Sequence, residues 1–127
     1  MSTKKFVTAI NCMDGRVQLP VINWMRKQFA AEYVDMITEP GPVKILAENA
    51  TKEIIDSLQK RVEISIKKHG SSCIAIIGHY DCTGNPVDKH TQLGQLKAAI
   101  PIIQSWGFQT PVIGLWVDEN WTTHQVL

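Results

Sequence analysis

Short apolar runs rich in β-branched residues alternate along this chain with longer segments of helical periodicity, and this alternation restricts the fold more than any other feature. Such runs are typical of strands that helices cover on both faces. The expected strands are Lys5–Asn11, Tyr33–Thr38, Cys73–Gly78 and Pro111–Val117. Strand–helix alternation favours parallel strands joined by right-handed crossovers. We therefore predict an α/β fold, a single domain over residues 1–127 with an open parallel sheet of about four strands and helices on both faces.

Three helices are expected between the strands. The first, Leu19–Phe29, carries a proline in its first turn, where the missing N–H has no helical partner to lose. The second, Thr51–His69, has a stripe of apolar residues at i, i+4 spacing and ends before a glycine. Its stripe consists of Ile54, Ile55, Leu58, Val62 and Ile66. The third runs from about Leu93 to Trp106, and Pro101 should kink or split it.

Two further segments are not assigned to this pattern. Glu39-Pro40-Gly41-Pro42 is expected to be neither helix nor central strand, because proline and glycine interrupt both. The tail Asp118–Leu127 is too short to classify.

Two clusters of chemically active side chains follow the first and third expected strands. Cys12-Met13-Asp14-Gly15-Arg16 follows the first, and His79-Tyr80-Asp81-Cys82 follows the third. In a doubly wound sheet, ligands lie beyond the carboxyl ends of the strands, where the winding reverses. With the strand order 2-1-3-4, the first and third strands are neighbours. We therefore expect Cys12 and His79 to lie close together in space.

The residue types in these clusters predict a metal centre. The thiols of Cys12 and Cys82 and the imidazole of His79 form a nitrogen and sulfur ligand set suited to zinc. Three protein ligands leave a position for water, which distinguishes a catalytic zinc from a structural one. Tetrahedral coordination with Zn–S bonds of about 2.3 Å would place the two sulfurs roughly 3.7–3.8 Å apart. Cys73, within an apolar strand, is expected to be a buried hydrophobic residue.

Composition excludes several classes of function. Charged residues make up 20% of the chain and the net charge is +1, so no broad basic face for nucleic acid is expected. No apolar run approaches the ~20 residues of a membrane span, and the first residues lack the apolar stretch of a signal peptide. Three cysteines without a secretion signal favour a reducing compartment. We expect a cytoplasmic protein that binds neither nucleic acid nor membrane.

The two clusters resemble the signature of the β-class carbonic anhydrases. Cys-x-Asp-x-Arg after the first strand and Gly-His-x-x-Cys after a later one match residues 12–16 and 78–82. Val17 and Pro20 follow the first motif much as in that family, and residues 114–120 are similar to its last strand and loop. The resemblance therefore covers most of the chain.

This resemblance implies a function and a role for each site residue. It implies Zn²⁺ as cofactor, held by Cys12, His79 and Cys82, and a catalytic dyad of Asp14 and Arg16. In the family the aspartate either orients zinc-bound water or itself ligates the metal. The implied reaction is the reversible hydration of carbon dioxide to bicarbonate by hydroxide generated at zinc. A homodimer with the site near its interface is also implied.

Two internal segments of the sequence depart from the family, and alternatives remain open. Glu39–Pro42 stands where the family usually has Arg-Asn-Ala-Gly, and Thr83–Pro86 replaces a small glycine-rich stretch. A non-catalytic zinc-binding domain, with Asp14 as fourth ligand, is one alternative. An enzyme acting on carbonyl sulfide or carbon disulfide is another. A thiol redox protein would instead use Cys12 and Cys82 as a disulfide.

Overall fold

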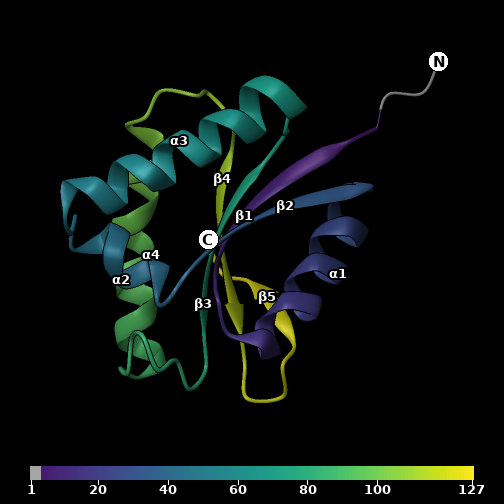
Figure 1. Ribbon diagram of the computed structural model, residues 1–127. Coiled ribbons are helices and arrows are strands. Elements are labelled where there is room, and N and C mark those ends of the chain that lie inside the picture. The colour runs from purple at the N-terminus through teal and green to yellow at the C-terminus, as the bar shows by residue number, and fades with distance from the viewer. Residues whose placement is uncertain (1–3) are drawn as a thin grey trace.

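Four parallel strands form the centre of the computed structural model, which describes residues 4–127 (Figure 1). In sheet order they are β2 (Tyr33–Glu39), β1 (Phe6–Cys12), β3 (Ile74–His79) and β4 (Val112–Val117). The predicted order 2-1-3-4 is confirmed. A short fifth strand, β5 (Thr123–Gln125), pairs antiparallel with β4 at the edge of the sheet. It lies in the tail that the sequence pattern left unassigned, because three residues are too few to show a periodicity.

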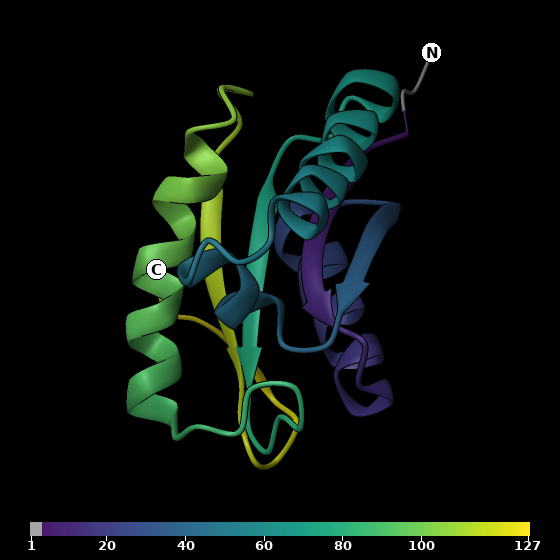
Figure 2. The same ribbon diagram turned by 60° about the vertical axis from the view of Figure 1, so that its left-hand side comes forward.

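The connections between the four parallel strands contain helices. They comprise a 3₁₀ turn, η1 (Gly15–Val17), and the helices α1 (Gln18–Phe29), α2 (Pro42–Ala47), α3 (Lys52–His69) and α4 (Lys89–Gln104). Figures 1 and 2 show α1 on one side of the sheet and α2, α3 and α4 on the other, which confirms the prediction of helices on both faces. Among residues 4–127, no helix is both long enough and apolar enough to cross a bilayer.

Each face of the sheet has its own hydrophobic core. Successive residues of a strand point to opposite faces. In β3, Ala75 and Ile77 pack into the core under α1, whereas Ile74 and Ile76 pack into the core under the other three helices. All four side chains are almost completely buried. Burial on both faces explains why this strand has no polar side.

The buried face of α3 differs from the predicted stripe at two positions. Ile55, Leu58 and Val62 are buried as expected, but Ile54 is exposed and Ser65 takes the next buried position. Ser65 lies against the sheet because its hydroxyl hydrogen-bonds to that of Thr8 at 2.6 Å. A polar residue in the stripe was not predicted, since its partner is 57 residues away in the sequence.

The segment Glu39–Pro42 is more regular than predicted. Glu39 is the last residue of β2, and Pro42 is the first residue of α2, where a missing N–H costs nothing. Only the two residues between them are irregular, and Gly41 has a left-handed backbone conformation with φ +59°. The expectation that this segment contains no helix was therefore wrong at Pro42, whereas Glu39 belongs to an edge strand and not to a central one.

Helix α4 continues through Pro101, so the helix is not split there. A proline removes one helical N–H and leaves the carbonyl four residues earlier without its partner. Pro101 and Lys97 both lie on the exposed side of α4 and within its last three turns. Solvent can therefore satisfy the Lys97 carbonyl, and the helix remains intact.

Candidate metal centre

The carboxyl ends of β1 and β3 bring three potential metal ligands together. Cys12 is the last residue of β1, His79 is the last residue of β3, and Cys82 follows in the loop after β3. Because these parallel strands are neighbours, both ends lie at the same edge of the sheet (Figure 2). The two sulfurs are 3.8 Å apart, and one ligand atom from each of the three residues lies within 4.8 Å of the others. The predicted convergence of Cys12, His79 and Cys82 is confirmed.

The ring of His79 is oriented so that one nitrogen points at the two sulfurs. Its Nδ1 donates a hydrogen bond to the Tyr80 carbonyl at 2.8 Å, which leaves the lone pair on Nε2. Nε2 is buried and has no hydrogen-bond partner among the described residues. A buried polar atom without a partner is unfavourable in a folded protein. Metal-binding histidines have this arrangement: one ring nitrogen donates a hydrogen bond to a backbone carbonyl, and the other keeps a free lone pair for the metal.

Gln92 on α4 fixes the position of His79. Its side-chain oxygen accepts from the His79 backbone N–H at 3.1 Å, and its side-chain N–H donates to the His79 carbonyl at 2.8 Å. Gln92 is buried and occupies the apolar face of α4 together with Leu96. The role of Gln92 was not predicted from the sequence. Gln92 could have been identified as a polar residue at a position where the helical periodicity predicts an apolar one.

The hydrogen bond between the two sulfurs shifts the pKa values of Cys12 and Cys82 in opposite directions. The hydrogen bond from Cys82 lowers the pKa of Cys12 to about 4, and the same hydrogen bond raises the pKa of Cys82 far above its usual range. Backbone N–H groups of Gly41 and Asp14 hydrogen-bond to the Cys12 sulfur and further lower its pKa. Burial lowers the pKa of His79, but the nearby Cys12 thiolate and the hydrogen bond to the Tyr80 carbonyl outweigh it, and the net shift is upward. The cluster thus already stabilises one thiolate.

Asp14 and Arg16 form a two-point ion pair beside the cluster. The Arg16 Nε–H donates to both carboxylate oxygens of Asp14, at 3.1 and 3.2 Å, and Nη2 donates to Oδ2 at 2.7 Å. Hydrogen bonds from Arg16 hold the pKa of Asp14 down at about 2, so the carboxylate is ionised at neutral pH. Asp14 does not belong to the group of close ligand atoms. Its carboxylate is directed to Arg16.

Two amide side chains fix the loop that carries the dyad. Asn11 is buried, accepts from the Cys12 N–H at 2.9 Å and donates to the Val17 carbonyl at 3.2 Å. Gln18, at the start of α1, donates to the carbonyls of Cys12 and Asp14 at 2.7 and 2.8 Å. Neither role was predicted from the sequence, because the bonding partners are backbone groups, which every residue carries.

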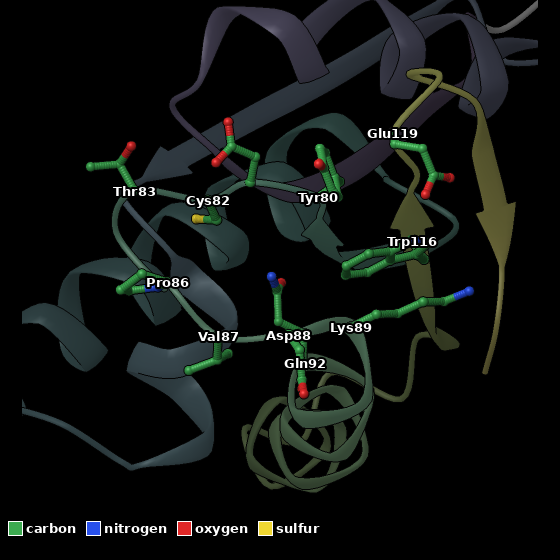
Figure 3. A pocket seen from close by; sticks show the side chains of 11 residues that line it. Tyr80, Cys82, Thr83, Pro86, Val87, Asp88, Lys89, Gln92, Trp116 and Glu119 are labelled. Carbon is green, nitrogen blue, oxygen red and sulfur yellow. The ribbon is translucent and has the colours of Figure 1, made fainter.

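A cavity of about 680 Å³ is lined by the loop that follows β3, the first turn of α4 and the end of β4. Figure 3 shows Cys82 at its edge, Tyr80 and Trp116 along one side, and Lys89 extended beside the Trp116 ring. Cys82 is the only member of the cluster that lines this cavity, and Asp14 and Arg16 do not line it. The cavity therefore meets the cluster from the Cys82 side alone.

Comparison with known proteins identifies the family. A sequence model of a family described as "putative carbonic anhydrase" matches residues 2–127. The chain belongs to this family. The carbonic anhydrase from Streptococcus mutans has 16% identity and a TM-score of 0.62, and the match covers 100% of this chain and 86% of that one. The β-carbonic anhydrase isoform I from Trichomonas vaginalis has 17% identity and a TM-score of 0.58, with 100% and 87% covered. No curated protein matches the chain.

These matches confirm the resemblance seen in the sequence. The family is shown by the match over nearly the whole chain, and the solved structures, at their low identity, show the fold. In this carbonic anhydrase family member, the segment that departs from the usual family sequence contributes directly to the cluster, because the Gly41 N–H hydrogen-bonds to Cys12.

Two glycines of this family member allow the loops around the cluster to touch. A Cβ atom added to Gly84 would lie 2.7 Å from the Pro40 carbonyl carbon and 2.9 Å from the Gly41 nitrogen. A Cβ on Gly41 would lie 2.7 Å from the Gly84 oxygen. These neighbours are backbone atoms, which cannot move aside as a flexible side chain does. The loop after β2 and the loop after β3 are therefore in direct backbone contact.

We expect Gly84→Ala to destabilise the protein by about 1–3 kcal/mol, as overpacking does, and to weaken metal binding. The added methyl group pushes the Pro40–Gly41 backbone away from Cys12. Chemical denaturation and metal titration measure the two effects. Gly94→Ala is the matched control, since a Cβ there meets nothing within 4 Å. Within α4 it should be neutral or stabilising by about 0.5–1 kcal/mol. Equal behaviour of the two variants would contradict the loop contact.

Proposed function

We propose that this protein is a zinc-dependent carbonic anhydrase-like lyase that catalyses the reversible hydration of carbon dioxide to bicarbonate. One observation carries the proposal most strongly. The buried Nε2 of His79 lacks a hydrogen-bond partner among the described residues and faces two sulfurs 3.8 Å apart. That separation equals the edge of a tetrahedron with Zn–S bonds of about 2.3 Å. Membership of the carbonic anhydrase family supports the choice of reaction.

The residues of the cluster fit zinc by their chemistry. Cys12, Cys82 and His79 would hold the ion, and Gln92 and the Tyr80 carbonyl would keep the imidazole in place as outer partners. Backbone N–H groups directed at the sulfurs disperse the charge of two thiolates. Bound there, zinc would lower the pKa of a water molecule to roughly 7 and so supply a nucleophile at neutral pH.

Asp14 and Arg16 would orient the reaction. The Asp14 carboxylate is ionised and can only accept hydrogen bonds, so it is suited to hold the hydrogen of an attacking water and direct the oxygen lone pair. Arg16 fixes this carboxylate through both of its oxygens. The positive charge of Arg16 also offsets part of the negative charge that two thiolates bring to the centre.

Hydration of carbon dioxide by zinc-loaded protein tests this proposal. Stopped-flow mixing with a pH indicator measures proton release, and the protein stripped of metal is the control. We expect activity that follows zinc content in proportion. Stoichiometric zinc without hydration would reject the enzyme and support the alternative of a non-catalytic zinc-binding domain.

A related substrate is the second candidate, because the surroundings of the cluster differ from those of the family. The segment Glu39–Pro42 replaces residues that usually line the pocket, and its Gly41 contacts the loop after β3 through backbone atoms. Carbonyl sulfide and carbon disulfide are hydrated by the same chemistry as carbon dioxide. Parallel assays with the three substrates would rank them by kcat/KM.

We also propose that the protein is a cytoplasmic homodimer whose interface lies near the cluster. Met13, Leu19 and Tyr80 are large apolar or aromatic residues with 62%, 67% and 49% of their surface exposed. Met13 and Tyr80 directly follow two of the proposed ligands, and such exposed apolar surface marks interaction sites. The three free cysteines agree with a reducing compartment. Sedimentation measures the mass, and a monomer at high concentration would contradict the dimer.

Zinc affinity should fall as the pH falls. Zinc binds the deprotonated forms of cysteine and histidine, so binding displaces protons. The pKa values of Cys82 and His79 are both raised, so at neutral pH at least one proton must leave when zinc binds. We expect the affinity to weaken about tenfold per pH unit for each proton displaced. Competition with a chelator from about pH 8 to about pH 6 measures this slope, and a constant affinity would contradict the ligand set.

A further inference from the structure

The guanidinium of Arg16 is held on three sides by separate parts of the chain. One edge binds Asp14. A second edge donates from Nη2 to the Asp81 carbonyl at 3.0 Å, and Nη1 lies 3.3 Å from the Asp81 carboxylate. The flat face lies 4.5 Å from the centre of the Trp121 ring. Arginine stacked on an aromatic face gains from cation–π attraction and from dispersion.

Two of the residues that contact the Arg16 guanidinium, Asp81 and Trp121, have unusual backbone conformations. Asp81 has φ +57° and Trp121 has φ +59°, which is the left-handed region. Aspartate adopts this conformation more readily than most residues, whereas for a bulky residue such as tryptophan it is an outlier. Strained conformations of this kind persist only where the surrounding structure enforces them, and they cluster at functional sites.

The turn between β4 and β5 enforces the conformation of Trp121. The Trp121 N–H donates to the Asp118 carbonyl at 2.9 Å. The Asp118 carboxylate accepts from the backbone N–H groups of Asn120 and Thr122 at 2.9 and 3.0 Å, and it also contacts His124 at 2.7 Å. The Tyr80 ring meets Trp121 edge to face, with ring centres 6.4 Å apart. These contacts fix the Trp121 indole independently of its contact with Arg16.

We propose that Trp121 is a positioning residue, which holds the Arg16 guanidinium so that Nε and Nη2 face Asp14. An arginine side chain has many rotamers in solution, and packing on a fixed ring removes those that point away from the carboxylate. Trp121 acts on the site through its contact with Arg16. This role deepens the proposed function, because it concerns the dyad that the function requires.

The Arg16 Nε–H resonance tests the inference directly, on the zinc-loaded full-length protein by ¹⁵N NMR. Arg16→Lys identifies the signal by its loss. In the wild type we expect one slowly exchanging Nε–H signal, displaced by the ring current of the indole. Trp121→Leu should remove the displacement. It should also speed exchange of this hydrogen with water about tenfold, which corresponds to the loss of a partly desolvated cation–π contact. Trp121→Phe, which keeps an aromatic face, should restore most of the wild-type behaviour.

Trp106→Leu is the matched control, since Trp106 packs against Phe108 in the core on the other face of the sheet. It should leave the Arg16 signal unchanged. An unchanged Arg16 signal in Trp121→Leu, or an equal change in Trp106→Leu, would overturn the inference. In kinetics, Trp121→Leu should lower kcat more than it changes KM. If the wild type proves inactive, the proposed function fails, but the NMR comparison still decides whether Trp121 positions Arg16.

Discussion

Replacing a proposed ligand, as in Cys12→Ser or His79→Ala, is expected to abolish zinc binding and carbon dioxide hydration together. Each variant leaves two of three ligands, and metal binding needs the complete set. The loss of affinity should exceed the roughly 10- to 100-fold that removal of an outer partner costs. Zinc content after dialysis and competition with a chelator measure the loss.

Cys73→Ala is the control for this experiment. Cys73 is buried like the other two cysteines, but burial raises its pKa to about 11 and it lies outside the cluster. The variant should keep stoichiometric zinc and full activity. Retention of tightly bound zinc by Cys12→Ser, or its loss from Cys73→Ala, would contradict the ligand set.

The sequence predicted the central fold because burial on both faces of a parallel strand leaves a visible pattern. The apolar run before His79 is such a case, and so is the run before Cys12. The order of the strands then brought these two residues together. Helix α2 and strand β5 were missed because each is too short to show a period, and because Pro42 in α2 was taken as an interruption when it begins the helix.

The sequence predicted the ligands of the site more fully than the residues that hold them in position. Cys12, His79 and Cys82 were identified from residue type and spacing alone. Gln92 and Trp121 were not, because their roles depend on contacts with residues distant in the sequence. The hydrogen bond from Gly41 to Cys12 was not predicted either, since it uses a backbone N–H that almost any residue carries, in a conformation that favours glycine.

Asp14→Asn is expected to separate catalysis from metal binding. Asparagine keeps the size of the side chain and one oxygen that can accept from Arg16, but it loses the charge. If Asp14 orients the attacking water, zinc stays bound and hydration slows by on the order of 10²-fold or more. If Asp14 were a permanent fourth ligand, the affinity for zinc would fall about 10- to 100-fold or further. Asp56→Asn, an exposed carboxylate on α3, is the control and should change neither quantity.

Arg16→Ala should act on the same step. Without Arg16 the Asp14 carboxylate loses its three hydrogen bonds from that side chain and is free to turn toward the cluster. We therefore expect slower hydration with zinc retained, and a double variant no slower than the more damaged single variant, because the two residues act as a unit. Independent, multiplying effects would contradict the dyad. The structure favours the orienting role over permanent ligation, because Asp14 lies outside the group of close ligand atoms and gives both oxygens to Arg16.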